Sequence, residues 1–198
     1  MIQGDASWLA LKCGKITGSR FHAAMDVNKR TGKPNASRRA LVKTLREEIA
    51  TGIPEHVEPN IYMAHGKKLE PEARRLYGFM TGRELIVPAF IHSAALEYVG
   101  FSPDGIFGDY GMIEIKCPYM EARHLRTVES KCVPDEYVPQ VQGGLFVTGR
   151  AWIDYCSYFP SLGIEIVRVQ RDDAFIARLA QACVDVWDEV QSNNRSVA

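Results

Sequence analysis

Two carboxylates and one lysine lie close together near the middle of the chain. Residues 112–116 alternate apolar and polar, so Glu114 and Lys116 share one face of a predicted strand. The segment before this strand is rich in glycine and aspartate, which predicts a turn centred on Asp109. Such a reversal places Asp104 directly opposite Glu114, and cross-strand neighbours lie roughly 4.5–5.5 Å apart. Two carboxylates at that separation repel each other unless a cation lies between them.

Oxygen ligands of this kind suit a hard divalent cation such as Mg²⁺. Lys116 would lie beside that cation, where its amine could orient or deprotonate a water molecule. The alternative is an ordinary turn aspartate followed by a solvated strand face, which is the commoner use of these residue types. Two features favour chemistry: Pro103 and Pro118 bound the element, and isoleucines flank Glu114 in a strand that is otherwise apolar.

The spacing from Asp104 through Glu114 to Lys116 resembles the D-(D/E)XK nuclease pattern. The fuller string SPDG…IEIKCP resembles the phage lambda exonuclease family, also described as YqaJ-like viral recombinases. Further stretches follow in the family's order and with similar spacing, namely Trp8 to Ser19, Gly66 to Tyr77, and Gln140 to Thr148. The resemblance covers nearly the whole chain. It implies an α/β fold in which helices flank a central mixed β-sheet, the restriction-endonuclease-like PD-(D/E)XK core.

The family implies a 5′→3′ exonuclease that acts on double-stranded DNA ends. It would release 5′ mononucleotides and leave a 3′ single strand for recombination. By the same resemblance, Asp104, Glu114 and the Ile115 carbonyl would hold one Mg²⁺, and Glu70 would help to hold a second, with Mn²⁺ as a possible substitute. Lys116 would orient or deprotonate the attacking water, and the two cations would stabilise the attacking and leaving oxygens of an in-line displacement.

The opening motif, WLALKCGKITGS, is similar to the family segment that holds the DNA 5′-phosphate. Lys12 stands where the family has an arginine, and a lysine is a point charge without the bidentate fork. The ordinary use of Thr17 or Ser19 would be to cap a short helix. The resemblance implies that the 5′-phosphate contacts come from Lys12, Thr17, Ser19, Ser102 and Gln140.

A net charge of zero hides an uneven distribution along the chain. Residues 1–46 hold ten lysines and arginines against two acidic residues, and the rest of the chain is acidic by the same amount. A basic segment of this kind favours a phosphate-binding face, although the acidic remainder could also neutralise it within the fold. The predicted DNA contacts in this segment are Lys29, Arg30, Lys33 and Arg38, and the loop charges among them could equally be solvated.

Composition excludes several other classes of protein. Five scattered cysteines without a CxxC pair argue against a zinc or iron–sulfur site and fit a reduced cytoplasm. No apolar run approaches the ~18 residues of a membrane span, and no signal peptide is visible at the N-terminus. At 198 residues, a single domain is expected across 1–198. The family further implies a toroidal homotrimer around DNA, a phage single-strand annealing protein as partner, and the cytoplasm of a bacterial host.

The elements that would position these residues follow from periodicity, caps and chain breakers. Helices are expected at 20–25, 37–49, 60–80, 120–130, 134–148 and 172–190. Strands are expected at 85–91, 96–101, 112–116, 151–159 and 164–169.

Five residues of the predicted helices lead to specific predictions about their surroundings. Pro71 fits a helix only where the helix begins or restarts. Tyr62 and Met63 favour core packing over a wedge between DNA bases. Gly143 and Gly144 each cost a helix about 1 kcal/mol relative to alanine, which predicts the close approach of another backbone or of DNA.

The sequence also leaves two other functions open. A sequence- or structure-specific endonuclease could be built on the same core. A DNA-end binding recombination scaffold could have lost catalysis, although the intact set of Asp104, Glu114 and Lys116 argues against it. Cleavage of closed circles would identify the endonuclease, and Mg²⁺-dependent loss of duplex would exclude the scaffold.

Overall fold

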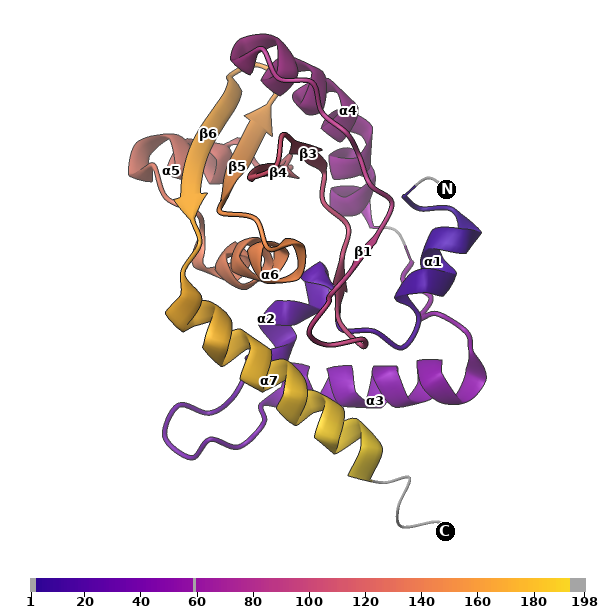
Figure 1. Cartoon of the computed structure of the whole chain (residues 1–198). Helices are drawn as coiled ribbons and strands as arrows, with labels where there is room; N and C mark the ends of the chain where they lie inside the picture. The colour runs from indigo at the N-terminus through magenta and orange to yellow at the C-terminus, as the bar shows by residue number, and fades with distance from the viewer. Residues whose placement is uncertain (1–2, 59, 193–198) are drawn as a thin grey trace.

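The computed structural model describes residues 3–58 and 60–192 (Figure 1). Its helices are α1 (Ala6–Lys12), α2 (Phe21–Ala24), α3 (Ala36–Thr51), α4 (Ile61–Thr81), α5 (Glu121–Ser130), α6 (Val138–Thr148) and α7 (Asp173–Ser192). Its strands are β1 (Ile91–His92), β2 (Gly100–Phe101), β3 (Gly105–Phe107), β4 (Gly111–Lys116), β5 (Trp152–Phe159) and β6 (Gly163–Gln170). Short 3₁₀ helices, η1 (Gly18–Arg20) and η2 (Asp135–Tyr137), precede α2 and α6.

In the described part of the chain, the main sheet has the strand order β3-β4-β5-β6. β4 and β5 are parallel, whereas the β3–β4 and β5–β6 pairs are antiparallel. The crossover from β4 to β5 contains α5 and α6. In Figure 1 the sheet and α4 form the upper half of the molecule, α2, α3 and α7 form the lower half, and α6 lies between them. The mixed sheet flanked by helices confirms the predicted α/β class.

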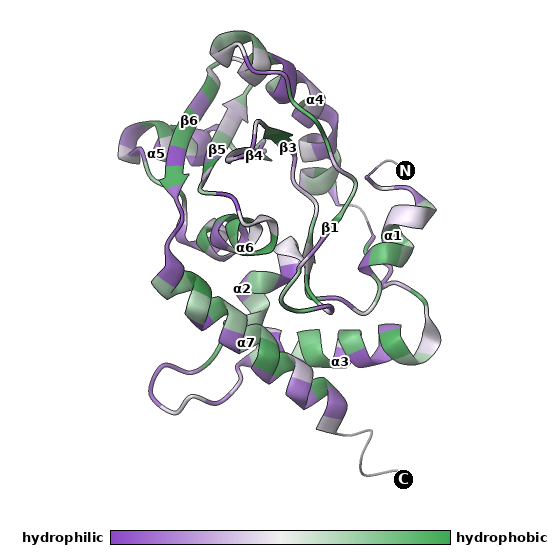
Figure 2. Ribbon diagram, in the orientation of Figure 1, coloured by the Kyte–Doolittle hydropathy of each residue, from purple (hydrophilic) through white to green (hydrophobic). Residues whose placement is uncertain are grey.

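The two faces of β4 are buried against different helices. Ile113 and Ile115 pack in one cluster with Tyr77 of α4. Met112 lies in the other cluster, to which α2, α3, α6 and α7 contribute. Glu114 is also buried, at 2 % exposure, so the polar residues of β4 do not form a solvated face. Figure 2 shows alternating hydrophobic and hydrophilic bands along α3 and α7, as expected of helices with one buried side.

The register of the β3–β4 hairpin agrees with the prediction from sequence. Gly105 pairs with Ile113 and Phe107 with Gly111, so the turn covers residues 108–110. One step further along the same register, Asp104 stands opposite Glu114. The hairpin predicted at 151–169 is also present as β5 and β6.

The two predicted strands before this hairpin are mostly absent. The short β1 and β2 pair with each other, and isolated bridges join Ile86 to Ile106 and Val99 to Ile16. Pro88 interrupts the first predicted strand, and a proline has no N–H to donate to a sheet. The prediction of long strands at 85–91 and 96–101 is therefore wrong, whereas the predicted helices agree with the observed ones to within a few residues.

Helix α4 corrects two predictions. It runs unbroken through Pro71, which does not mark a start or a restart. Pro71 and Lys67, the residue whose carbonyl loses its donor, are both exposed, so water can satisfy that carbonyl. Tyr62 and Met63 are 57 % and 48 % exposed, so they do not pack in the core.

The adjacent glycines of α6 are explained by core packing. A Cβ atom on Gly143 would lie 2.2 Å from the ring of Phe21, and one on Gly144 would lie 2.6 Å from Met112 Cε. The close neighbours are thus side chains of the core, and the prediction of a backbone or DNA at this place is wrong. None of the described helices is long and apolar enough to cross a membrane.

Candidate active site

The β3–β4 hairpin brings Asp104, Glu114 and Lys116 together. Lys116 Nζ donates to Glu114 Oε1 at 2.7 Å, and Asp104 Oδ2 accepts the backbone N–H of Ile115 at 2.6 Å. The side chain of Glu114 is 3 % exposed and that of Lys116 is 24 % exposed. The charged pair therefore lies mostly out of water, where its electrostatic interactions are stronger than at the surface.

Helix α6 adds Gln140 to this group. Gln140 Nε2 donates to Glu114 Oε1 at 2.5 Å, and Gln140 Oε1 accepts from Lys116 Nζ at 3.1 Å. The amide therefore joins the two charged residues, and its predicted contact with the 5′-phosphate stays a prediction. Tyr137, the last residue of η2, was not singled out from sequence, and its ring centroid lies 5.0 Å from Lys116 Nζ.

The carboxylates of the site are electrostatically unfavourable as they stand. Burial raises the pKa of Asp104 well above its usual range, and the neighbouring Glu114 and Glu70 raise it further. Burial also raises the pKa of Glu114, although Lys116 partly offsets this. Burial lowers the pKa of Lys116, but Glu114 and Asp104 outweigh burial, and the net pKa is raised. The site holds more potential negative charge than one lysine neutralises, which favours a bound cation.

Glu70 approaches the site from α4. It pairs with Arg74 one turn later in the helix, and Arg74 Nε donates to the backbone carbonyl of Asp104 at 2.7 Å. Arg74 therefore ties α4 to the hairpin. Sequence reasoning missed Arg74, although an arginine four residues after a glutamate on a predicted helix indicates an ion pair. The Glu70–Arg74 pair would have to open before Glu70 could bind a cation.

The donor atoms fit a divalent cation in kind, but they do not form a closed cluster. Among the described residues, no group of three or more His, Cys, Asp or Glu side chains could hold a metal ion as they are placed. Glu114 Oε2 is buried and has no hydrogen-bond partner in the described structure. A buried carboxylate oxygen without a partner is unfavourable, and a hard cation would satisfy it. Asp104 and the Ile115 carbonyl could complete the set from the same hairpin.

The residues predicted to bind the 5′-phosphate gather beside this site. Lys12 Nζ lies 3.8 Å from the ring centroid of Trp8, and Trp8 Nε1 donates to Ser102 Oγ at 2.9 Å. Ser102 is two residues from Asp104. Ser19 is exposed and Thr17 is buried. Between Thr17 and Ser19, a Cβ on Gly18 would lie 3.6 Å from Gln140 Cγ, so this segment lies against α6.

A buried ion pair supports the segment that carries Lys12. The Arg20 guanidinium donates to both carboxylate oxygens of Glu48, at 2.8 and 2.6 Å, and Glu48 also accepts the backbone N–H of Gly14 at 2.8 Å. Burial and the nearby charge of Arg20 lower the pKa of Lys12 to about 8. Lys12 is therefore a cation whose charge depends on pH near neutrality.

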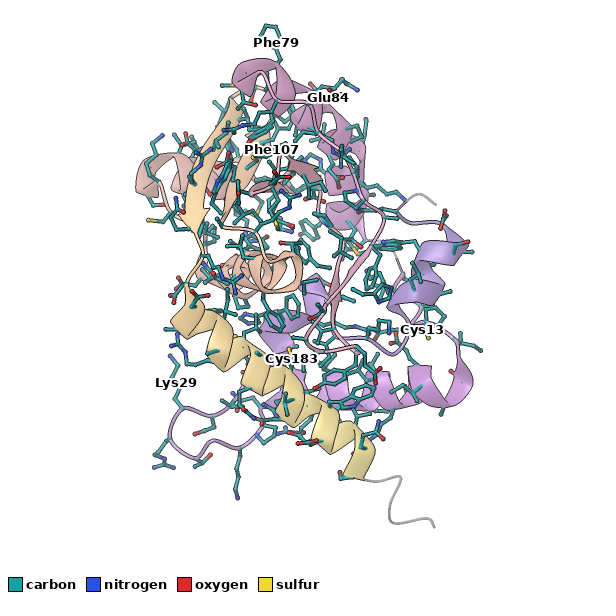
Figure 3. All side chains as sticks on the ribbon, viewed as in Figure 1. Cys13, Lys29, Phe79, Glu84, Phe107 and Cys183 are labelled. Atoms are coloured by element: carbon teal, nitrogen blue, oxygen red, sulfur yellow. The ribbon has the colours of Figure 1, made fainter. Side chains whose placement is uncertain are left out.

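The predicted DNA contacts of the basic segment divide into two kinds. Lys29, Arg30 and Lys33 are exposed on the loop between α2 and α3. In Figure 3, Lys29 lies at the lower edge of the molecule, whereas Phe107 of β3 lies in its upper half, so this loop is not beside the hairpin. The prediction for Arg38 needs correction. Its side chain is 5 % exposed and pairs with Glu189 at 2.7 Å, so it joins α3 to α7 and does not face DNA.

Comparison with known proteins places this geometry in a family. The model of the YqaJ-like viral recombinase domain matches residues 7–151. A comparison with curated proteins finds no match. Among solved structures, an alkaline exonuclease from Laribacter hongkongensis is 32 % identical, with a TM-score of 0.86, and the alignment covers 98 % of this chain and 96 % of that one. Its complex with dAMP gives the same identity and coverage with a TM-score of 0.88.

A phage-related exonuclease from Haemophilus somnus shares the fold at 18 % identity and a TM-score of 0.74, with 93 % of this chain and 96 % of that one covered. The family match spans most of the chain, from the Lys12 segment through the Asp104–Lys116 hairpin to the end of α6. The chain belongs to the YqaJ-like viral recombinase family.

Proposed function

We propose that the chain is a Mg²⁺-dependent 5′→3′ exonuclease on double-stranded DNA ends. It releases 5′ mononucleotides and leaves 3′ single strands for recombination by strand annealing. Family membership and the exonuclease relatives support a DNA exonuclease role. The observation that carries the chemistry is the contact of Lys116 with Glu114 and Gln140, beside Asp104, at the end of β4.

The donor set would hold the metal through Asp104, Glu114 and the Ile115 carbonyl, with Glu70 available for a second ion once it leaves Arg74. When bound, Mg²⁺ or Mn²⁺ would supply Lewis-acid stabilisation of the attacking and leaving oxygens.

The amine of Lys116 is positioned to hold a water molecule. An ammonium group has three donors, and Glu114 and Gln140 use two of them, so one remains for a water molecule or a phosphate oxygen. Gln140 fixes both partners, because it donates to Glu114 and accepts from Lys116. The chain thus orients the nucleophile through a lysine whose own position is set by two neighbours.

Digestion of linear duplexes with 5′-phosphate or 5′-hydroxyl ends, beside a closed circle and in Mg²⁺ or EDTA, tests this function. We expect loss of linear DNA only, from the 5′ ends, fastest with phosphate and absent in EDTA. Cutting of the circle would keep the hydrolytic chemistry but replace the exonuclease with an endonuclease. Binding of ends without any cleavage would leave a recombination scaffold.

Replacing Lys12 with alanine should reduce the preference for 5′-phosphorylated over 5′-hydroxyl ends by roughly tenfold or more, because a charged hydrogen bond to phosphate is lost. In the unchanged protein, the preference should fall as the pH rises through about 8, where Lys12 loses its proton. The measurement is the ratio of initial digestion rates on the two ends across this range.

Lys15→Ala is the matched control, since Lys15 is nearby but bonds outward to the Glu97 carbonyl at 3.2 Å. Lys12→Arg should keep the preference and remove its pH dependence. An unchanged ratio in Lys12→Ala would remove Lys12 from the phosphate pocket.

We also propose that the protein works as a toroidal homotrimer with a phage single-strand annealing protein, in the cytoplasm of a bacterial host. The family resemblance supports this, and Phe79, 88 % exposed near the end of α4, offers apolar surface to another copy (Figure 3). Light scattering should give the mass of three 22.2 kDa chains, and a single-chain mass would contradict the ring.

A further inference from the structure

Gly66 is a glycine that the fold does not explain. It lies inside α4, where glycine is unfavourable relative to alanine, and its φ is not in the left-handed region. A Cβ atom at Gly66 would meet nothing within 4 Å. The other helical glycines differ, because a Cβ on Gly78 would meet the Arg83 carbonyl at 3.2 Å and one on Gly143 would meet Phe21 at 2.2 Å. Nothing inside the protein therefore needs the absence of a side chain at Gly66.

A cluster of aromatic side chains includes two residues of α4 close to Gly66 in sequence. Tyr62 of α4 contacts Tyr119 edge to face, with ring centroids 5.4 Å apart, and His65 contacts the same ring at 5.2 Å. Tyr62 and Tyr119 are 57 % and 51 % exposed. Tyr119 follows Lys116 by three residues, so this exposed aromatic group is continuous with the candidate active site.

Spacing along α4 links the aromatic group to the metal-binding residue. Tyr62, Gly66 and Glu70 are separated by four residues each, so they follow one another along one face of the helix. On this face, Gly66 thus lies between the exposed ring of Tyr62 and the carboxylate of Glu70, and it has no side chain to fill the space. The next residues, Lys67 and Lys68, are exposed and positively charged.

We propose that this face of α4, with Tyr119 opposite, binds a single-stranded stretch of the DNA substrate next to the reacting phosphate. Bases stack on the rings of Tyr62 and Tyr119, and the strand passes close to the helix over Gly66. Aromatic faces beside lysines are the features that bind single strands without sequence preference, because every base offers a flat face. The inference rests on the proposed function for the identity of the substrate.

Gly66→Ala separates this role from a structural one. Alanine favours the helix and meets no neighbour, so the melting temperature should rise by about 2–4 °C. Binding of single-stranded DNA in EDTA should nevertheless weaken about tenfold. Gly78→Ala, the same change in the same helix, should leave binding unchanged. If Gly66→Ala is more stable and binds as tightly as the unchanged protein, no strand passes over Gly66 and the proposal is wrong.

The stacking is tested with single strands that carry 2-aminopurine, whose fluorescence falls when it stacks. Tyr62→Ala and Tyr119→Ala should each reduce this quenching and weaken binding about tenfold. Tyr110→Ala is the matched control, since Tyr110 is 69 % exposed on the β3–β4 turn at the other end of β4. Equal quenching in all variants would overturn the proposal.

These measurements are made in EDTA, so they do not depend on hydrolysis. If the unchanged protein fails to digest DNA but its variants show the predicted binding defects, the strand-binding surface is supported and the proposed nuclease function is contradicted. If the unchanged protein digests DNA but the Gly66, Tyr62 and Tyr119 variants show no binding defect, the proposed function is supported and the strand-binding surface is contradicted.

Discussion

Lys116→Ala should lower the rate of DNA hydrolysis by about a hundredfold or more, because the loss of one preorganised donor at a reacting centre costs roughly 10²–10³-fold. Binding of DNA ends in EDTA should change by less than about twofold, since the Nζ of Lys116 is directed to Glu114 and Gln140. The measurement is single-turnover digestion of a 5′-phosphorylated duplex, beside an equilibrium binding assay.

Lys43→Ala is a matched control, because Lys43 is 77 % exposed and only pairs with Glu47 along α3. Lys116→Arg preserves a positive charge beside Glu114 but replaces the compact ammonium with a planar group. If positive charge alone were needed, Lys116→Arg would restore the rate. We expect Lys116→Arg not to restore hydrolysis. Near-normal turnover of Lys116→Ala would remove Lys116 from the mechanism.

The centre of the site was predictable because all of its information is local. A period of two residues fixed the face shared by Glu114 and Lys116, and the turn residues fixed the reversal. These two features determine the register, so Asp104 could be placed opposite Glu114 from the sequence alone. No contact distant in sequence was needed for this step.

Contacts distant in sequence were the ones that sequence reasoning missed. Gln140 bonds to Glu114 across 26 residues, and Arg38 pairs with Glu189 across 151. Arg38 was assigned to a DNA face because it lies in the basic segment of residues 1–46, and nothing near it in sequence indicates the acidic residue on α7. A periodic pattern identifies the buried side of a helix. It does not identify the distant residue that pairs with a charged side chain, such as that of Arg38, on the buried side.

The glycines of α6 show the same limit in another form. Their presence in a helix predicted the close approach of another backbone or of DNA, but the close neighbours are side chains of the core. For Gly143 that neighbour is the buried ring of Phe21, which begins α2 directly after the η1 segment. Core packing in α6 and the placement of the predicted phosphate-binding segment therefore depend on each other.

Gly143→Ala should accordingly destabilise the protein by about 1–2 kcal/mol, because the close contact puts the overpacking cost at the upper end of its range. Alanine gains about 1 kcal/mol of helix propensity, but overpacking a core typically costs 1–3 kcal/mol and at times more. The new Cβ would lie 2.2 Å from a ring that is fully buried, so the ring has to move. Urea unfolding measures the loss, and the opposite sign is expected for Gly66→Ala, where the same chemical change meets open space.

A double-mutant cycle identifies the cause of the loss. Phe21→Ala removes all the ring atoms that the new Cβ would meet, so in the Gly143→Ala background it should cost less than it does alone. Simple additivity of the two losses would mean that the ring of Phe21 is not the obstacle. Because Phe21 follows η1, displacement of the ring should also weaken the preference for 5′-phosphorylated ends, and this would connect the packing of α6 to recognition of the DNA end.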